Sequence, residues 1–137
     1  AYSDPVNGTS NPKLIPGGFA TYTLTVTAPA GTVPTSNSVI VTDIIPANLA
    51  LFVGTYLPGP GPIAFGAGSS GLTYSFVSLA STSDDLSFSN NGGTTWTYVP
   101  TPDANGVDTA VTHIRINPKG SMAGGSSFTI NLRAQVK

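Results

Sequence analysis

The chain of 137 residues contains few side chains suited to acid–base chemistry. Its one histidine is His113, its six acidic residues are all aspartate, and it has neither glutamate nor cysteine. Catalysis of the Ser-His-Asp type would require His113 to meet a serine and an aspartate from elsewhere in the chain. Its neighbours instead favour a half-exposed strand position beside Arg115. The sequence therefore predicts a non-enzymatic protein without a cofactor, and the lack of cysteine excludes thiolate metal sites.

Calcium binding is a second kind of chemistry to consider, because two segments offer oxygen ligands. Asp103, Asn105 and Asp108 lie in the segment TPDANGVDT, and Asp84 with Asp85 forms a second group. The spacing does not match an EF-hand loop, and Asx-turns on a solvated loop explain the same residues. Glycoside hydrolysis by the adjacent pair is disfavoured, because neighbouring residues on a strand point to opposite faces.

Aromatic residues around position 96 favour either a turn or a sugar platform. The segment from Ser89 to Trp96 follows the spacing S-x-D-x-G-x-T-W, with Asn91 in place of the aspartate. It resembles the Asp-box hairpin of sialidase-type propellers, where the motif is a structural turn, and the arginine cluster that sialic acid would need is missing. Trp96 and Tyr98 lie two residues apart on one predicted strand face. They could stack on surface glycans or pack into the core.

Two covalent modifications are compatible with the sequence. Asn7 begins an N-G-T sequon and is a glycosylation candidate. Lys13, Lys119 and Lys137 are candidates for isopeptide cross-links of the kind found in some surface sandwiches, with an aspartate in place of the usual glutamate. An intact mass lower by one ammonia or one water would reveal such a cross-link.

The charge content limits the partners of the chain. Charged residues make up 8% of it and the formal net charge is −1, whereas soluble domains usually contain about 25% charged residues. Nucleic acid is an unsuitable partner, because phosphate binding needs clustered lysine and arginine. Low charge favours self-association, so we expect copies of the chain to pack together.

The chain shows no membrane-spanning or signal segment. No run of about 18 apolar residues occurs, so neither a membrane span nor a signal peptide is expected. A small first residue such as Ala1 is what signal cleavage leaves, and a domain cut from a longer protein begins in the same way.

The elements that must position these residues are short strands separated by Gly, Pro and Asn, a pattern typical of a sandwich or barrel. The pattern predicts eight or nine strands in a single domain covering residues 1–137. The predicted strands are 20–27, 38–45, 49–56, 72–79, 86–89, 95–99, 111–117 and 127–136. The Pro- and Gly-rich segment 57–71 is predicted to be a long loop or a crossover between sheets.

The segment 127–136 has the clearest strand pattern. Its apolar residues alternate with polar ones, and they are Phe128, Ile130, Leu132, Ala134 and Val136. A slip of the register by one residue would expose all of them. We interpret this strand as the closing strand of the core, with donation to a neighbouring copy as the alternative.

Four segments resemble the conserved-repeat surface domain known as domain of unknown function eleven. They are SDPVNGTSNPKLIPG from residue 3, ATYTLTVT from residue 20, VIVTDIIPANL from residue 39, and the stretch from residue 111 to residue 137. The resemblance implies an immunoglobulin-like β-sandwich, Greek-key in type, in a secreted or cell-surface protein without catalytic residues. The family often occurs in tandem arrays, whereas a single copy is present here.

A solitary secreted sandwich can build filaments by adding a terminal strand to the open edge of the next copy. The donor candidates are the segment from Ala1 to Val6, which includes Tyr2, and the last strand from Ser127 to Val136, which includes Phe128. The sequence thus predicts an extracellular structural subunit of a pilus-like filament or stalk. The alternative is an adhesin or carbohydrate-binding surface module.

Overall fold

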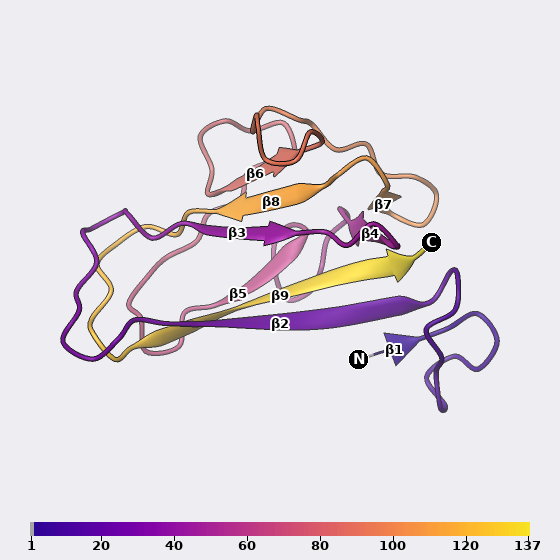
Figure 1. Ribbon diagram of the computed structural model, residues 1–137, viewed down its shortest axis with the longest axis horizontal. Coiled ribbons are helices and arrows are strands. Elements are labelled where there is room, and N and C mark those ends of the chain that lie inside the picture. Colours follow the sequence, from indigo (N-terminus) through magenta and orange to yellow (C-terminus); the bar gives the residue numbers. More distant parts are fainter. Residues whose placement is uncertain (1) are drawn as a thin grey trace.

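The computed structural model describes residues 2–137, which form nine β-strands and no helix (Figure 1). The strands are β1 (Tyr2–Ser3), β2 (Phe19–Thr27), β3 (Val41–Ile44), β4 (Leu49–Phe52), β5 (Ile63–Gly66), β6 (Leu86–Ser89), β7 (Val107–Asp108), β8 (His113–Ile116) and β9 (Ser127–Val136). The predicted all-β class is confirmed. In the described part of the chain no helix exists that is long and apolar enough to cross a membrane.

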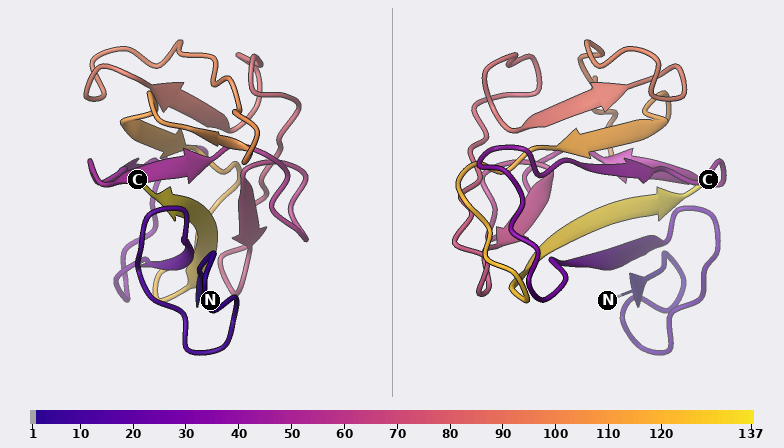
Figure 2. Two further views of the ribbon diagram at one scale, coloured as in Figure 1. Left: turned by 90° about the vertical axis from the view of Figure 1, so that its right-hand side faces the viewer. Right: turned by 60° about the vertical axis from the view of Figure 1, so that its left-hand side comes forward.

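Two antiparallel sheets form a β-sandwich (Figures 1 and 2). The larger sheet has six strands in the order β1-β2-β9-β4-β7, with β5 also paired to β9, and the smaller sheet has the order β3-β8-β6. Except for β1 and β2, paired strands are not consecutive in the sequence. The chain therefore passes repeatedly from one sheet to the other, and both sheets depend on contacts between distant segments.

Strand β9 forms the centre of the larger sheet. One of its edges pairs with β2 along the whole of β2, and the other pairs first with β5 and then with β4. The alternating side chains of Phe128, Ile130, Leu132 and Ala134 are all buried on the inner face. The predicted alternation is confirmed, and burial of each large apolar side chain stabilises the fold by roughly 1.5–3 kcal/mol.

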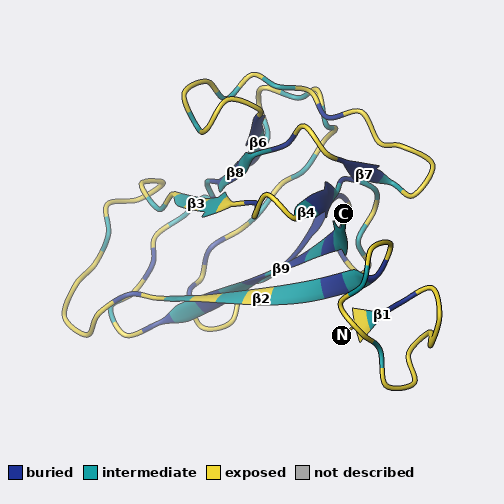
Figure 3. Cartoon of the chain, turned by 45° about the vertical axis from the view of Figure 1, so that its right-hand side comes forward, coloured by how far each residue is buried: buried dark blue, intermediate teal, exposed yellow. Residues whose placement is uncertain are grey.

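The smaller sheet supplies the opposite half of the core. Phe88 of β6 and Ile114 and Ile116 of β8 are buried in the same apolar cluster as the inner face of β9. In the larger sheet, strand β2 is only partly covered. Its buried and intermediate positions are interrupted by exposed ones (Figure 3). The alternating threonines of β2 face outward, as the sequence predicts.

Segment 57–71, for which the sequence predicts a long loop or a crossover between sheets, contains strand β5. Its prolines and glycines flank a short apolar stretch, in which Ile63 and Ala64 are buried and pair with β9. The prediction missed this strand, because the four residues Ile63–Gly66 suffice for a ladder. Burial of Ile63 against β9 then outweighs the breaking tendency of its neighbours.

Two predicted strands, 72–79 and 95–99, form only isolated bridges, from Thr73 to Lys119 and from Tyr98 to Phe88. Between 72 and 79 two backbone N–H groups bond to side chains: Ser75 N–H donates to the Asp85 carboxylate and Val77 N–H to that of Asp84. Side-chain acceptors of this kind replace ladder bonds. The two-residue strands β1 and β7 were not predicted, since so short a pattern carries no periodicity.

On the outer face of the larger sheet, Arg133 packs against the rings of Phe19 and Phe52. The guanidinium of Arg133 lies 4.1 Å from the ring centre of Phe19 and 5.3 Å from that of Phe52. The Phe52 ring in turn lies directly over Gly54 and Gly106, where a Cβ atom would come within 2.7 and 2.6 Å of the ring. Glycine is therefore required beneath this ring, and Arg133 is held by packing rather than by an ion pair.

Candidate functional site

Within residues 2–137, most of the outer edge of β2 has no pairing strand, because β1 reaches only its first two residues. The hydrogen bonds at the ends of the β2–β9 ladder show which groups face outward. Val136 N–H donates to the Gly18 carbonyl at 2.8 Å, and Ala28 N–H donates to the Ser126 carbonyl at 3.0 Å. Even-numbered residues of β2 thus bond to β9, since antiparallel pairs alternate between bonded and non-bonded.

The odd-numbered residues of β2 consequently direct their backbone groups away from β9. Beyond the reach of β1, the N–H and C=O groups of Thr23, Thr25 and Thr27 face solvent along an extended strand. Three outward-facing pairs of donors and acceptors form a template on which another strand could be added.

The residues of β2 lack every common form of edge protection. The strand FATYTLTVT is nine residues long and carries no charge and no proline. Natural edge strands are usually short, or carry lysine, proline or a bulge, because an unprotected edge pairs with other chains. The uncharged, proline-free pattern of β2 is visible in the sequence. That β2 lies at an edge follows only from the strand order.

An apolar groove of about 220 Å³ lies beside this edge, between β2 and β3. Tyr22 and Leu24 of β2 form one wall, and Ile44 of β3 with the carboxyl-bearing Asp43 forms the other. Leu51 and Leu132 are among the lining residues between them. Ile44 is 64% exposed although it is large and apolar. Ile44 pairs with His113 on the outward face of the smaller sheet, so its exposure adds apolar surface at the rim of the groove. A strand added to β2 could place alternate side chains into the groove.

The facing edge, that of β3, carries a charge. The half-buried Asp43 pairs with Ile114 in the β3–β8 ladder and so shares the inward face of the smaller sheet. Burial raises the pKa of the Asp43 carboxyl, and a backbone hydrogen bond from Ile44 and the nearby His113 partly oppose that rise. Inward-pointing charges disfavour strand addition, and Pro46 lies two residues beyond the end of the strand. The edge of β2 is therefore the less protected of the two.

The two donor candidates differ in how firmly the chain itself holds them. Strand β9, with Phe128, Ile130, Leu132 and Val136, is bonded along both edges within its own sheet. The N-terminal candidate contributes only Tyr2 and Ser3 to the sheet. Tyr2 is 50% and Val6 77% exposed, and Ala1 lies outside the described residues. Release of β9 would dismantle the larger sheet, whereas release of β1 would cost few contacts.

Asp4 holds the loop that follows β1. Its carboxylate accepts hydrogen bonds from the backbone N–H groups of Val6, Asn7 and Lys13 at 2.8, 2.7 and 2.6 Å. The side-chain amide of Asn7 adds a fourth bond at 3.1 Å. Backbone donors from Asn7 and Lys13 lower the pKa of Asp4 to about 2, so the carboxylate is ionised at neutral pH.

The glycosylation candidate Asn7 lies on this loop and is exposed. Its side-chain nitrogen donates to the Asp4 carboxylate, so a glycan attached there would have to share or replace that bond. Sequence reasoning missed the role of Asp4, although Asp-x-x-Asn is a common turn signal.

The calcium candidates are engaged in turns and in a buried bond. Asp103 accepts the N–H groups of Asn105 and Val107 at 2.8 and 3.1 Å. Asp108 is buried and accepts the Tyr98 hydroxyl at 2.8 Å, besides backbone donors. Across residues 2–137 no group of three or more His, Cys, Asp or Glu side chains is arranged to hold a metal. The carboxylates act here as local anchors for the loop from 99 to 110.

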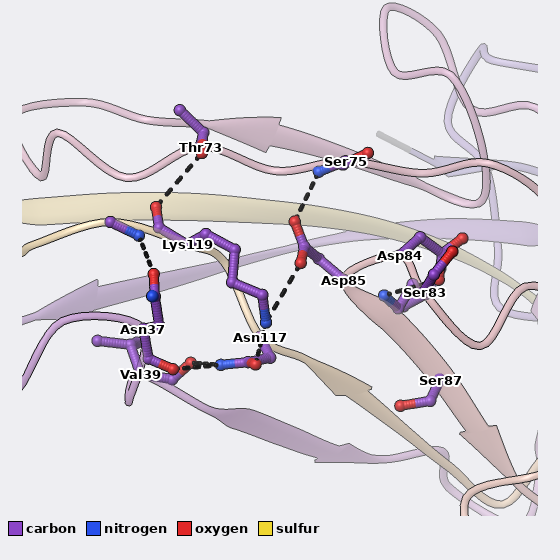
Figure 4. A network of polar contacts seen from close by, with 12 residues as sticks. Asn37, Val39, Thr73, Ser75, Ser83, Asp84, Asp85, Ser87, Asn117 and Lys119 are labelled. Carbon is purple, nitrogen blue, oxygen red and sulfur yellow. Dashed lines mark hydrogen bonds and ion pairs between the residues drawn. The ribbon is translucent and has the colours of Figure 1, made fainter.

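Asp84 and Asp85 likewise serve different partners. Asp84 accepts Val77 N–H at 3.0 Å, and Figure 4 shows the contacts of Asp85. The buried Asp85 forms an ion pair with Lys119 at 3.4 Å and accepts Ser75 N–H at 2.8 Å. Lys119 Nζ also donates to the side-chain oxygen of Asn117. Of the three lysines predicted as cross-link candidates, Lys119 is the one that lies beside a carboxylate and an amide. The contacts of Asp85 and Lys119 connect segment 72–79 to the ends of β6 and β8.

The Asp-box-like segment forms a tight turn after β6. The buried Ser89 hydroxyl donates to Asn91 at 2.9 Å and accepts Gly93 N–H at 3.0 Å. The side-chain oxygen of Asn91 accepts Thr95 N–H at 3.0 Å. These hydrogen bonds form a structural turn. The turn places the half-buried Trp96 at the edge of the smaller sheet.

Trp96 and Tyr98 take different positions beyond this turn. Tyr98 packs against the core and bonds to Asp108. The Arg115 guanidinium lies 4.6 Å from the centre of the Trp96 ring, and the ring of His113 lies 6.5 Å away, edge-on. The two aromatic residues both line a groove of about 450 Å³. They do not form one flat platform, since Tyr98 is anchored inward.

Comparisons with protein-family models, curated proteins and solved structures give no match for this chain.

Proposed function

We propose that this chain is an extracellular structural subunit that assembles with copies of itself by strand addition to the open edge of β2. One observation carries the proposal. The C-terminal two thirds of β2 present unpaired backbone groups on an uncharged strand, directly beside an apolar groove. Both the hydrogen bonds and the side-chain pockets that strand addition needs are thus available at one place.

The N-terminal segment of a second copy is the proposed donor. It is held to its own sheet by two residues of β1, and its last residue, Val6, is exposed. The hydrogen bonds of Asp4 in this segment go to the following loop and not to the sheet. Charged residues make up only 8% of the chain, which reduces repulsion between copies. A head-to-tail joint of this kind propagates as a filament when it does not close into a ring.

A single substitution tests the acceptor edge. In Thr25→Pro the outward N–H is lost, while the bonds of Leu24 and Val26 to β9 remain, so the fold is retained. Thr25→Val keeps the N–H and serves as the control. We expect the parent and Thr25→Val proteins to form concentration-dependent assemblies in light scattering and negative-stain microscopy, and Thr25→Pro to remain monomeric.

Removal of residues 1–3 tests the donor. We expect this deletion to abolish assembly as Thr25→Pro does, with an unchanged melting temperature. A parent protein that shows only compact monomers at all concentrations would overturn the proposal. Secretion, which the proposal requires, is tested by tagging the protein in its own host and locating it by cell fractionation.

A further inference from the structure

We infer that the groove of about 450 Å³ beside the smaller sheet is a binding site for an acidic saccharide, a sugar chain that carries carboxylates. The groove lies between segment 79–88, residues 96–99 and the outward side chains of β8. It is separate from the edge of β2, and the inference does not depend on strand assembly.

The groove contains a cation without a partner carboxylate. Arg115 extends from β8, and its Nε donates to the Ser87 hydroxyl at 3.3 Å. Among residues 2–137 no carboxylate lies within ion-pairing distance of it. Its terminal nitrogens are thus available for a planar, bidentate acceptor, which is the geometry that guanidinium groups recognise in carboxylates.

The Trp96 ring lies against this cation in a fixed position. The Arg115 Cζ atom lies 4.6 Å from the centre of the Trp96 ring. The hydrogen bonds of Ser89 and Asn91 hold the turn that carries the ring. A half-buried indole lining a groove offers apolar area to the C–H face of a pyranose ring. Because the turn is already formed, little side-chain entropy is lost on binding.

The remaining walls supply hydroxyl, amide and carboxylate groups. Thr82, Ser87, Thr97 and Asn117 line the groove together with Asp84 and Asp85, and Figure 4 shows four of these residues from close by. The charge of Asp85 is paired with Lys119. Such short polar groups exchange hydrogen bonds with sugar hydroxyls, whereas an apolar peptide would leave them unsatisfied. The combination of a free guanidinium, an indole and hydroxyl groups therefore fits an acidic saccharide better than a neutral peptide.

Titration with tetragalacturonate tests the inference. Trp96 is the only tryptophan, so its fluorescence reports directly on the groove. Cellotetraose presents sugar rings without carboxylates, and tetraglutamate presents carboxylates without sugar rings. We expect a saturable fluorescence change with tetragalacturonate, and at least tenfold weaker binding of the two control ligands.

A pair of arginine variants completes the test. Arg115→Gln should weaken tetragalacturonate binding at least tenfold with an unchanged melting temperature. Arg133→Gln removes the same kind of stacked cation from the other sheet and should leave binding unchanged. The inference is overturned if the parent protein shows no saturable response in fluorescence or calorimetry. It is equally overturned if the three ligands bind alike, or if the two variants lose affinity equally.

Discussion

The hydroxyl of Tyr98 donates a 2.8 Å hydrogen bond to the buried carboxylate of Asp108. Removal of a donor from a buried carboxylate costs about 1–3 kcal/mol, because the acceptor is left without compensation. We expect Tyr98→Phe to lower the free energy of unfolding by about 1–2 kcal/mol, measured by urea denaturation. An unchanged midpoint would show that solvent replaces the bond.

Tyr74 should respond in the opposite direction. Its hydroxyl is buried without a hydrogen-bond partner in the described structure, and its ring stacks on Phe65 with centres 5.6 Å apart. Tyr74→Phe keeps the ring and removes the unsatisfied group, so we expect the free energy of unfolding to rise by about 1 kcal/mol. A loss of stability as large as that of Tyr98→Phe would contradict the assignment.

The same burial predicts how alkali acts on the fold. Burial raises the pKa of Tyr74, with smaller contributions from Asp84 and Asp85. The folded state therefore favours the protonated hydroxyl, and this contribution to stability is lost as the pH rises above the unfolded value of about 10. In an ultraviolet titration, we expect one tyrosine to ionise only when the protein unfolds, and this late phase should be absent from Tyr74→Phe.

The N-terminal loop should lose its order in acid, because it is held by the ionised carboxylate of Asp4. Its pKa is lowered to about 2, so its contribution to stability is present above the unfolded value of about 4 and is lost as the pH falls towards 2. In Asp4→Asn, we expect hydrogen exchange at Val6 and Lys13 to accelerate while β9 remains protected. Asp103→Asn, in another turn, is the control and should leave the N-terminal amides unchanged.

Gly106 and Gly31 provide a matched pair of glycines. Their φ angles are +75° and +80°, but a Cβ atom at Gly106 would lie 2.6 Å from the Phe52 ring, whereas nothing lies within 4 Å of one at Gly31. Gly31→Ala should cost about 1–2 kcal/mol for the backbone strain alone. Gly106→Ala should lower the melting temperature distinctly more, and Phe52→Leu in the same chain should recover part of the difference.

Strict alternation made β9 and β2 predictable, because side-chain period and burial agree there. Strand β5 could not be predicted, since its Pro- and Gly-rich flanks signal a loop and only the position of β9 makes Ile63 a core residue. Segment 72–79 has a strand pattern, yet the carboxylates of Asp84 and Asp85 take its backbone donors. Local sequence does not show which distant side chain competes for a backbone group.

The candidate sites divide in the same way. The turn from Ser89 to Trp96 was predicted from spacing, because its hydrogen bonds are local. The open edge of β2 and the stack of Arg115 on Trp96 depend on strand order, which no local pattern encodes.

The central position of β9 also determines when the protein can fold. Thr23 of β2 bonds to Asn131 of β9 across 108 residues, so a very large loop must close before this ladder forms. During synthesis, β2, β4 and β5 all emerge from the ribosome before the strand that joins them. Until Val136 is available, β2 has two uncharged edges exposed in a crowded cell, and the nascent chain is at greatest risk of pairing with another copy before its own sheet is complete.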